Sequence, residues 1–180
     1  MEKSEARVKA KEYRKSLDSF TKGTMDNAIK RTFLSLDKVQ NARKICVYIS
    51  ILNEVDTDEI IKELLRNGKE LYAPVVVGDD MIARRFSSVS DLKVGAFGIL
   101  EPQGVEVNPS ELDLIVVPMV AYNLNLDRIG YGKGYYDRFL IDSVTTIGLA
   151  YHGQQFDFTP DCFDKPLDMI VTDEGVLGCE

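Results

Sequence analysis

The chain has 180 residues, of which 44% are hydrophobic, so it can bury one core but is too short for two full domains, and we expect a single domain over residues 1–180. Asp and Glu number 29 against 22 Lys and Arg, and the net charge of -7 argues against nucleic acid, whose phosphates would be repelled. The N-terminus is charged, and no apolar run approaches the ~20 residues of a membrane span, so we expect no targeting segment or membrane anchor. The three cysteines are widely spaced, which argues against a disulfide framework and a cysteine-rich zinc site. Together these features predict a cytoplasmic protein.

Two helices are predicted at the start of the chain. An apolar stripe recurs at helical spacing at Ala6, Ala10, Tyr13, Leu17 and Phe20. Beside this stripe Lys3, Arg7 and Arg14 fall within roughly 40° of one another, so a basic row borders the buried face. A second helix is indicated by Met25, Ala28, Ile29, Thr32 and Leu36.

Short apolar runs then alternate with helical segments. Strands are predicted at residues 45–49, 71–77, 114–117, 146–150 and 169–171, the last of these being the final strand. A helix is expected to start after Asp56 or Thr57 and to end at Gly68, and another to start near Tyr135. This alternation predicts an α/β fold, a three-layer sandwich with a mainly parallel sheet.

Two details of the middle of the chain bear on the sheet. Pro74 lies inside the second predicted strand and indicates an edge, an end or a bulge there, because proline cannot donate a ladder hydrogen bond. Residues 81–86 are expected to pair with that strand. The segment 87–109 is rich in Gly, Ser, Pro and charge, so we expect connecting loops with one helical turn.

The densest group of chemically active residues is RIGYGKGYYD at residues 128–137, here called the glycine-rich segment. Alternate glycines let the backbone approach a ligand and turn N–H groups toward it, and a following helix would add its positive end. Arg128 and Lys133 add full charges, and Asp137 could hold magnesium that accompanies nucleotide phosphates. The segment therefore predicts phosphate binding.

A structural explanation of the same residues stays open on spacing alone. The glycines could form a turn, the two tyrosines could pack in the core, and Asp137 could stabilise a helix N-terminus. The spacing matches neither GxxxxGK followed by Ser or Thr nor GxGxxG.

The segment resembles the signature of the 5-formyltetrahydrofolate cyclo-ligase family, also called methenyltetrahydrofolate synthetases. The resemblance extends over VVPMVAYNLNLDRIGYGKGYYDRFL at residues 116–140, and further matching pieces are a KSEAR start, YISILNEVDTDEII, LYAPVV, GILEP, IGLAYHGQQ and DKPLDMIVTDE. It thus spans nearly the whole chain. Two departures stand out, Ile129 where the family has Leu and Tyr122-Asn123 where it has Phe-Asp.

The resemblance implies a fold similar to the sugar-phosphate isomerase and CoA-transferase group and an ATP- and Mg²⁺-dependent reaction. In that reaction 5-formyltetrahydrofolate becomes 5,10-methenyltetrahydrofolate, with release of ADP and phosphate, after phosphorylation of the formyl oxygen and ring closure. Such a reaction needs positioning and charge stabilisation more than a protein nucleophile. We find no persuasive Ser-His or Cys-His arrangement, and expect a monomer that binds this folate and ATP.

The resemblance also implies site residues. Those for ATP are Lys3, Arg7, Arg128, Ile129, Gly130, Tyr131, Gly132, Lys133, Gly134, Tyr135 and Tyr136. Those for the folate are Ile49 and Glu54, and those for magnesium are Asp137 and Asp164, with Asp161 close enough to compete for the second position. Arg14 stays undecided, Glu101-Pro102 matches a family pair, and the single histidine, His152, receives no catalytic role.

Ordinary explanations remain beside these assignments. Lys3 and Arg7 could form a solvated stripe, and Glu54 could be a loop acid near the helix start at Asp56. Two other functions are also open, a phosphosugar isomerase or CoA-transferase relative on the same fold, and a paralogue that binds folate or nucleotide without turnover.

Overall fold

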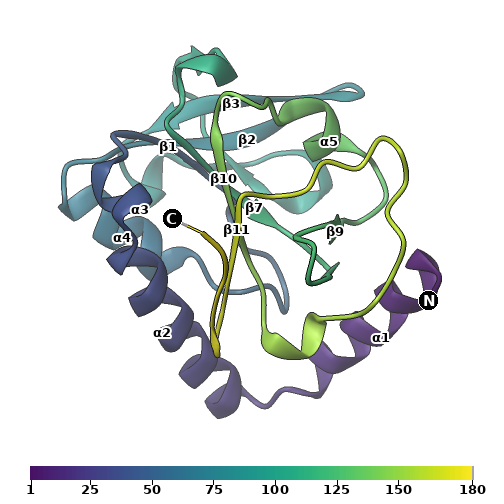
Figure 1. Cartoon of the computed structure of the whole chain (residues 1–180). Helices are drawn as coiled ribbons and strands as arrows, with labels where there is room; N and C mark the ends of the chain where they lie inside the picture. The colour runs from purple at the N-terminus through teal and green to yellow at the C-terminus, as the bar shows by residue number, and fades with distance from the viewer. Residues whose placement is uncertain (180) are drawn as a thin grey trace.

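The computed structural model describes residues 1–179 and has a large central sheet with helices on both faces (Figure 1). The helices are α1 (Lys3–Ser16), α2 (Ser19–Ser35), α3 (Asp37–Asn41), α4 (Asp58–Arg66) and α5 (Tyr135–Phe139). The strands of the central sheet are β1 (Lys44–Val47), β2 (Glu70–Val77), β3 (Asp80–Phe86), β6 (Glu106–Val107), β7 (Leu114–Pro118), β10 (Thr145–Leu149), β11 (Met169–Thr172) and β12 (Gly175–Gly178). Two small hairpins are formed by β4 (Lys93–Val94) with β5 (Leu100–Glu101) and by β8 (Ala121–Tyr122) with β9 (Arg128–Ile129).

The predicted α/β fold with a mainly parallel sheet is confirmed. The strand order is β12-β11-β10-β7-β1-β2-β3-β6, and the five strands from β11 to β2 run parallel. The flanking strands β12, β3 and β6 are antiparallel to their neighbours. From β1 the chain moves outward to β2 and β3, then returns to the other side of β1 as β7. The carboxyl ends of β1 and β7 therefore form a switch point, where open α/β sheets bind ligands.

One face of the sheet is covered by α2, α3 and α4, which lie together in Figure 1. Alternate strand residues point to this face, including Ile45, Val47 and Val116, and meet Ile29, Phe33, Ile60 and Leu64 from the helices. Gly68 ends α4 with φ 76°, and the N–H of Lys69 donates to the carbonyl of Leu64 at 3.0 Å.

The opposite face is covered more thinly. The side chains of Cys46, Ile115 and Val117 pack there with Phe139 of α5 and with Leu140, which follows it. Because α5 has only five residues, loops complete this layer. The second layer of helices is thus small, and it leaves room beside the sheet for a cavity.

The first helix packs on the β8–β9 hairpin and on residues 152–154, and its Tyr13 also contacts the core of the first face. Ala6 and Ala10 are fully buried against Val120, Ala121 and Ile129. The predicted stripe is wrong at Phe20, which is 83% exposed. The first helix ends at Ser16, and a new helix, α2, begins after Asp18, whose side chain accepts from the Thr21 N–H.

The structure also corrects several strand predictions. The first strand stops at Val47, so Tyr48 and Ile49 lie beyond it, and a further strand, β12, follows the segment expected to be last. The β8–β9 hairpin and the edge strand β6 were not predicted, because each has only two residues per strand. The expected pairing of residues 81–86 with the second strand is confirmed by β2 and β3.

Pro74 lies where the neighbouring strand β1 ends, and not at an edge of the sheet. The parallel register between β1 and β2 stops at the pair Cys46 and Tyr72, two residues before Pro74, while β3 continues alongside on the other side. No partner on the β1 side is therefore lost to the missing N–H. The uncovered part of β2 faces the space beyond the end of β1.

The core of the first face gives a stability prediction. Phe33→Ala should lower the free energy of unfolding by about 3–5 kcal/mol, because it removes a fully buried ring between α2 and the sheet. Urea titration followed by circular dichroism measures this change. The control on the same helix is Phe20→Ala, expected to stay within about 0.5 kcal/mol of wild type. Equal losses in the two variants would contradict the assignment of Phe33 to the core.

Candidate functional site

A cavity of about 680 Å³ opens at the carboxyl ends of β1 and β7, at the switch point of the sheet. Its walls come from the start of α1, the loop after β1, the second half of β2, the loop between β4 and β5, the glycine-rich segment and residues 161–164. Of the residues predicted for ATP, folate and magnesium, those that line it are Lys3, Arg7, Ile49, Glu54, Arg128, Gly130, Tyr131, Gly132, Lys133, Gly134, Tyr135, Tyr136, Asp137 and Asp164. The competing Asp161 lines it as well.

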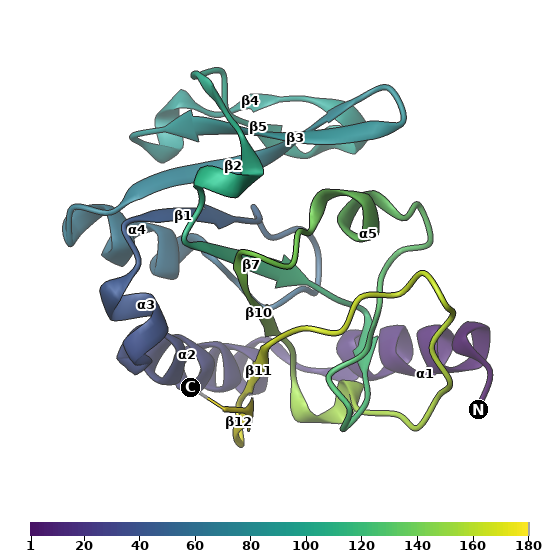
Figure 2. The ribbon, with the colours of Figure 1, turned by 45° about the horizontal axis from the view of Figure 1, so that its top comes forward.

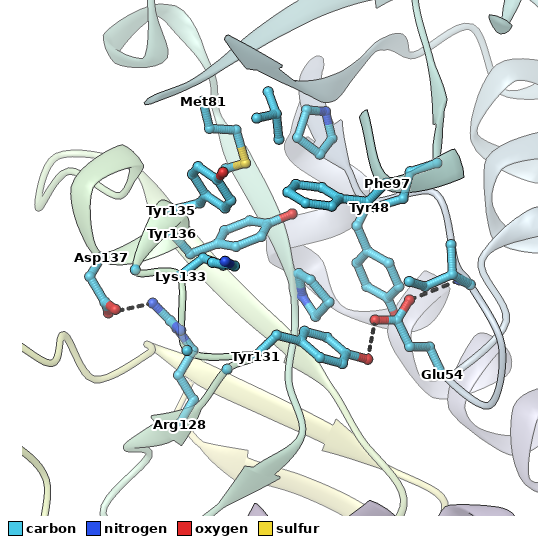
Figure 3. Close-up of a pocket in the computed structure, with 18 of the residues that line it drawn as sticks. Tyr48, Glu54, Met81, Phe97, Arg128, Tyr131, Lys133, Tyr135, Tyr136 and Asp137 are labelled. Carbon is cyan, nitrogen blue, oxygen red and sulfur yellow. Dashed lines mark hydrogen bonds and ion pairs between the residues drawn. The ribbon is translucent and has the colours of Figure 1, made fainter. Parts of the chain in front are cut away.

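The glycine-rich segment is positioned by the β8–β9 hairpin and by α5. The hairpin turns the chain back so that Arg128 enters the cavity wall, where its guanidinium lies 2.6 Å from an Asp137 carboxylate oxygen (Figure 3). Gly134 takes φ 69° just before α5, a conformation that favours glycine, and places Asp137 in the first turn. Arg128 is 4% exposed in its side chain and Asp137 27%, so the pair is well shielded from solvent.

The expected contribution of a helix N-terminus is small here. With five residues, α5 is little more than one turn and carries few aligned peptide dipoles. Attraction for an anion would therefore come from side-chain cations and from the backbone N–H groups of the glycine-rich segment.

The basic row of the first helix faces the glycine-rich segment, which argues against a solvated stripe. Arg7 Nε donates to the Gly130 carbonyl at 3.0 Å. Lys3 Nζ lies 2.8 Å from Asp161 and 2.5 Å from Asp164. Burial alone would lower the pKa of Lys3, but the hydrogen bonds that Lys3 donates to both aspartates, together with their negative charges, outweigh burial and raise the pKa, so Lys3 stays cationic.

Arg14 continues this row and reaches the other side of the site through a tyrosine. One of its terminal nitrogens donates to the Tyr131 hydroxyl at 3.1 Å, and that hydroxyl donates to Glu54 Oε1 at 2.7 Å. Burial and the nearby Glu54 carboxylate raise the pKa of Tyr131, so the phenol keeps its proton. The glycine-rich segment and the loop after β1 are therefore joined across the cavity (Figure 3).

Glu54 is buried, with 5% of its surface exposed, which excludes the explanation of a solvated loop acid. Its second oxygen accepts from the Ile51 N–H at 2.9 Å. Burial raises the pKa of Glu54, and the hydrogen bonds from Tyr131 and Ile51 oppose that rise. Each oxygen keeps a lone pair that could accept from a ligand.

The remaining wall of the cavity is apolar, and most of its residues are not predicted as site residues by the sequence. Tyr48, Met81 and Phe97 approach the cavity with Tyr135 and Tyr136 in Figure 3. Phe97 is 68% exposed and has φ 58°, an uncommon conformation for a residue with a side chain. It belongs to the loop segment 87–109, where the sequence pattern carries no position-specific signal. The one available signal was Pro74, which lines the cavity itself, as does Val76.

Glu101 of the noted Glu-Pro pair also lines the cavity. It is 8% exposed, and its carboxylate accepts from the Val76 N–H at 3.3 Å. A side chain at Gly95 would meet that carboxylate at 2.1 Å. Glu101 thus ties the loop between β4 and β5 to β2, which lies beside it in Figure 2.

Four of the residues noted in the sequence lie away from the cavity wall. Ile129 is 1% exposed and packs against α1, so its side chain does not reach an ATP site. His152 pairs with Asp173 through Nδ1 at 2.7 Å and does not line the cavity. At the departure from the family, Tyr122 is buried in β8, and the Asn123 side chain accepts from the Asp127 N–H at 3.0 Å, so this pair builds the turn before Arg128.

The carboxylates fit a metal that arrives with a ligand better than a protein-built cage. Within residues 1–179 no three His, Cys, Asp or Glu side chains cluster as a metal site. Asp137 and Asp164 both line the cavity and are paired with cations, Arg128 and Lys3. Magnesium commonly binds through one or two carboxylates plus phosphate oxygens and water, and this donor set suits that mode.

Comparison with known proteins agrees with this geometry. A sequence model described as the 5-formyltetrahydrofolate cyclo-ligase family matches residues 1–173. The chain belongs to this family.

Solved members of the family share the fold. The NMR structure of 5,10-methenyltetrahydrofolate synthetase from Aquifex aeolicus is 38% identical, with a TM-score of 0.88 over 98% of this chain and 92% of that one. The Mycoplasma pneumoniae 5,10-methenyltetrahydrofolate synthetase is 28% identical, with a TM-score of 0.81 over 96% and 99%. The 5-formyltetrahydrofolate cyclo-ligase of Haemophilus influenzae is 29% identical over 94% of this chain and 97% of its own.

Membership gives the chain an enzymatic class, that of the cyclo-ligases.

Within residues 1–179, no helix is both long enough and apolar enough to cross a membrane.

The burial of Glu54 gives a prediction about pH. A carboxyl whose folded pKa lies above its unfolded value of about 4.3–4.5 contributes less stability as pH rises through the folded pKa. Glu54→Gln cannot ionise and lacks this loss. The free energy of unfolding of the variant minus that of wild type should therefore be larger at pH 7 than at pH 5, which means that the variant gains stability relative to wild type as pH rises. Urea titrations of both proteins at the two pH values measure this. The prediction fails if the difference is the same at both, or larger in favour of wild type at pH 7.

Proposed function

We propose that this protein converts 5-formyltetrahydrofolate to 5,10-methenyltetrahydrofolate with ATP and Mg²⁺, releasing ADP and phosphate. The observation that carries the proposal is the single cavity in which the glycine-rich segment, Lys3 and Arg7 share a space with Glu54 and an aromatic wall. One cavity with a cationic side and an apolar side with a buried acid suits two ligands that must react with each other, a polyphosphate and a flat heterocycle. Membership of the cyclo-ligase family supports the same reaction.

The chemistry requires the formyl oxygen to become a leaving group. In the proposed course the formyl oxygen attacks the γ-phosphorus of ATP, the bond from that phosphorus to ADP breaks, and an imidate-like phosphate forms. The neighbouring folate amine then attacks the formyl carbon, phosphate leaves with the former formyl oxygen, and the amine proton passes to solvent. The protein contributes orientation of two bound molecules and charge stabilisation, which together can account for large rate accelerations.

The phosphates are assigned to the cations of the site. Lys3 and Arg128 each hold an aspartate without nucleotide, and the same two aspartates, Asp164 and Asp137, are the candidates for metal binding. With a magnesium nucleotide bound, the two aspartates would hold the cation, Arg128 would be free for phosphate oxygens, and Lys3 would keep Asp161 as a partner beside the phosphates. The ion pairs thus keep both sets of charges compensated in either state.

Magnesium would supply charge neutralisation on the phosphate oxygens. Asp137 and Asp164 would hold it, directly or through water. Arg7 and Lys133 line the same side of the cavity, and we assign them to the phosphates as well.

The folate is assigned to the other half of the cavity. The heterocycle presents a row of N–H donors along one edge, which fits the two acceptor oxygens of Glu54. Tyr48, Phe97 and Tyr136 offer aromatic faces and edges for the flat ring system. Ile49, 9% exposed and two residues beyond the end of β1, would contact the same ring.

We further propose that the enzyme acts in the cytoplasm as a monomer without nucleic acid or membrane partners. The acidic net charge of -7 supports the absence of nucleic acid. One copy of the chain already brings the residues assigned to both ligands to one cavity, which supports a monomeric enzyme.

Purified protein mixed with 5-formyltetrahydrofolate should form the methenyl product, followed by its absorbance, only when ATP and Mg²⁺ are both present. The reason is that the formyl oxygen cannot leave until it is phosphorylated. Folded protein that forms no product under these conditions would contradict the proposal and favour a binding paralogue or an isomerase relative.

A pair of variants ties the activity to this cavity. Asp137→Asn should lower kcat/KM for ATP by at least ~100-fold, since it removes a charge assigned to the magnesium nucleotide. The amide oxygen can still accept from Arg128, which limits the effect on folding. The control is Asp142→Asn, an exposed acid shortly after α5 that does not line the cavity, and it should retain wild-type activity.

A further inference from the structure

Arg14 is a buried cation with few bonds. It is 6% exposed, and Nε has no hydrogen-bond partner among residues 1–179. One terminal nitrogen lies 3.5 Å from the Met119 carbonyl, and the other donates to the Tyr131 hydroxyl at 3.1 Å. Within residues 1–179, no carboxylate forms a direct ion pair with Arg14. Burial of an arginine with so little compensation costs stability.

The compensation comes indirectly, from Glu54. The Tyr131 hydroxyl accepts from Arg14 and donates to Glu54 Oε1 at 2.7 Å, so the guanidinium and the carboxylate form an ion pair bridged by a phenol. Two cations of α1 also lie over the phenol ring, with Lys11 Nζ 5.6 Å and Arg14 Cζ 5.9 Å from its centroid. These contacts fix the direction in which Tyr131 points.

We infer that Arg14 is a positioning residue for the folate, which, through the Tyr131 hydroxyl, holds Glu54 ionised and oriented toward the cavity. This inference rests on the proposed cyclo-ligase function and deepens it, because it assigns a role to a residue that does not itself line the cavity. An ionised Glu54 can only accept hydrogen bonds, and so it matches the N–H edge of the folate ring. A protonated Glu54 would present one O–H donor to that edge and bind it less well.

The electrostatic surroundings of Glu54 are consistent with this role. Burial raises the pKa of Glu54, and the positive charge of Arg14 is one of the influences that oppose the rise. The titratable and charged groups that face Glu54 from the elements around it are Arg14 of α1, Lys22 and Asp26 of α2, Tyr48 after β1, Tyr131 and Tyr136 of the glycine-rich segment, and Tyr151 after β10. Lys22 is already paired with Asp26 at 2.8 Å. Within residues 1–179, the one side chain that accepts a hydrogen bond from Arg14 is Tyr131, whose hydroxyl donates to Glu54.

The bridge predicts a particular pattern in kinetics. Arg14→Leu should raise KM for 5-formyltetrahydrofolate about tenfold, the value of a hydrogen bond to a charged group, and change KM for ATP less than about twofold. Without the arginine, Glu54 protonates more readily, so the acid limb of kcat/KM for the folate should move to higher pH. Steady-state assays at several pH values, with the reaction without enzyme subtracted, measure both effects.

Tyr131→Phe breaks the bridge from the other end. In that background Arg14→Leu should add less than about twofold to KM for the folate, because the arginine acts through the hydroxyl. Arg14→Lys keeps a positive charge and should restore part of the wild-type KM. The control is Lys15→Met on the neighbouring exposed position of α1, which should leave both KM values unchanged.

The outcomes separate two failures. If wild-type protein neither converts nor binds 5-formyltetrahydrofolate, the proposed function falls, and this inference with it. If wild-type protein is active but Arg14→Leu leaves the folate KM and the acid limb unchanged, Arg14 is structural and the inference alone falls. Should Arg14→Leu not fold, Tyr131→Phe decides by the same two readouts, since the residue is 44% exposed and the change removes only the hydroxyl.

Discussion

The parallel pairing of β1 with β7 is the constraint on which the site depends. The register joins Ile45 to Leu114 and Val47 to Val116, so both strands end at the same edge of the sheet. Since the chain leaves β1 toward β2 and returns as β7 on the other side, the loops after the two strands diverge and leave a space between them. The loop after β1 brings Glu54 to this space, and the loop after β7 brings the glycine-rich segment through the β8–β9 hairpin.

The site concentrates charge that the fold must hold at a cost. Arg128 and Arg14 are both buried, and the Nε of each has no hydrogen-bond partner in the part of the chain that the structure describes. Ion pairs with Asp137 and, through Tyr131, with Glu54 reduce this cost but do not remove it, because buried pairs seldom repay their full desolvation. Buried charges of this kind are useful in a cavity that receives a charged ligand, because the same groups can exchange their protein partners for the ligand on binding. Stability is thereby given up in favour of a cavity organised in advance.

The sequence predicts the sheet and the cationic half of the site well, and the apolar half poorly. Apolar runs of four or five residues identify buried parallel strands, and the glycine-rich segment is recognisable because several unusual residues stand together. Phe20 was assigned to the wrong stripe because helical periodicity continues across the break after Ser16, where the Asp18 cap begins a new helix. Phe97 and Met81 could not be predicted as cavity residues, since their places depend on how the β4–β5 loop folds over β2 and not on any local pattern.

The central claim is that one cavity holds both substrates so that the formyl oxygen is phosphorylated directly. The most direct test uses 5-formyltetrahydrofolate labelled with ¹⁸O in the formyl group, and ³¹P NMR of the inorganic phosphate released in water of normal isotopic composition. If the formyl oxygen is phosphorylated directly, one ¹⁸O atom per turnover appears in the phosphate, seen as an isotope shift of its resonance. Phosphate without the label, formed together with the methenyl product, would show that the oxygen leaves by another route and would contradict the account.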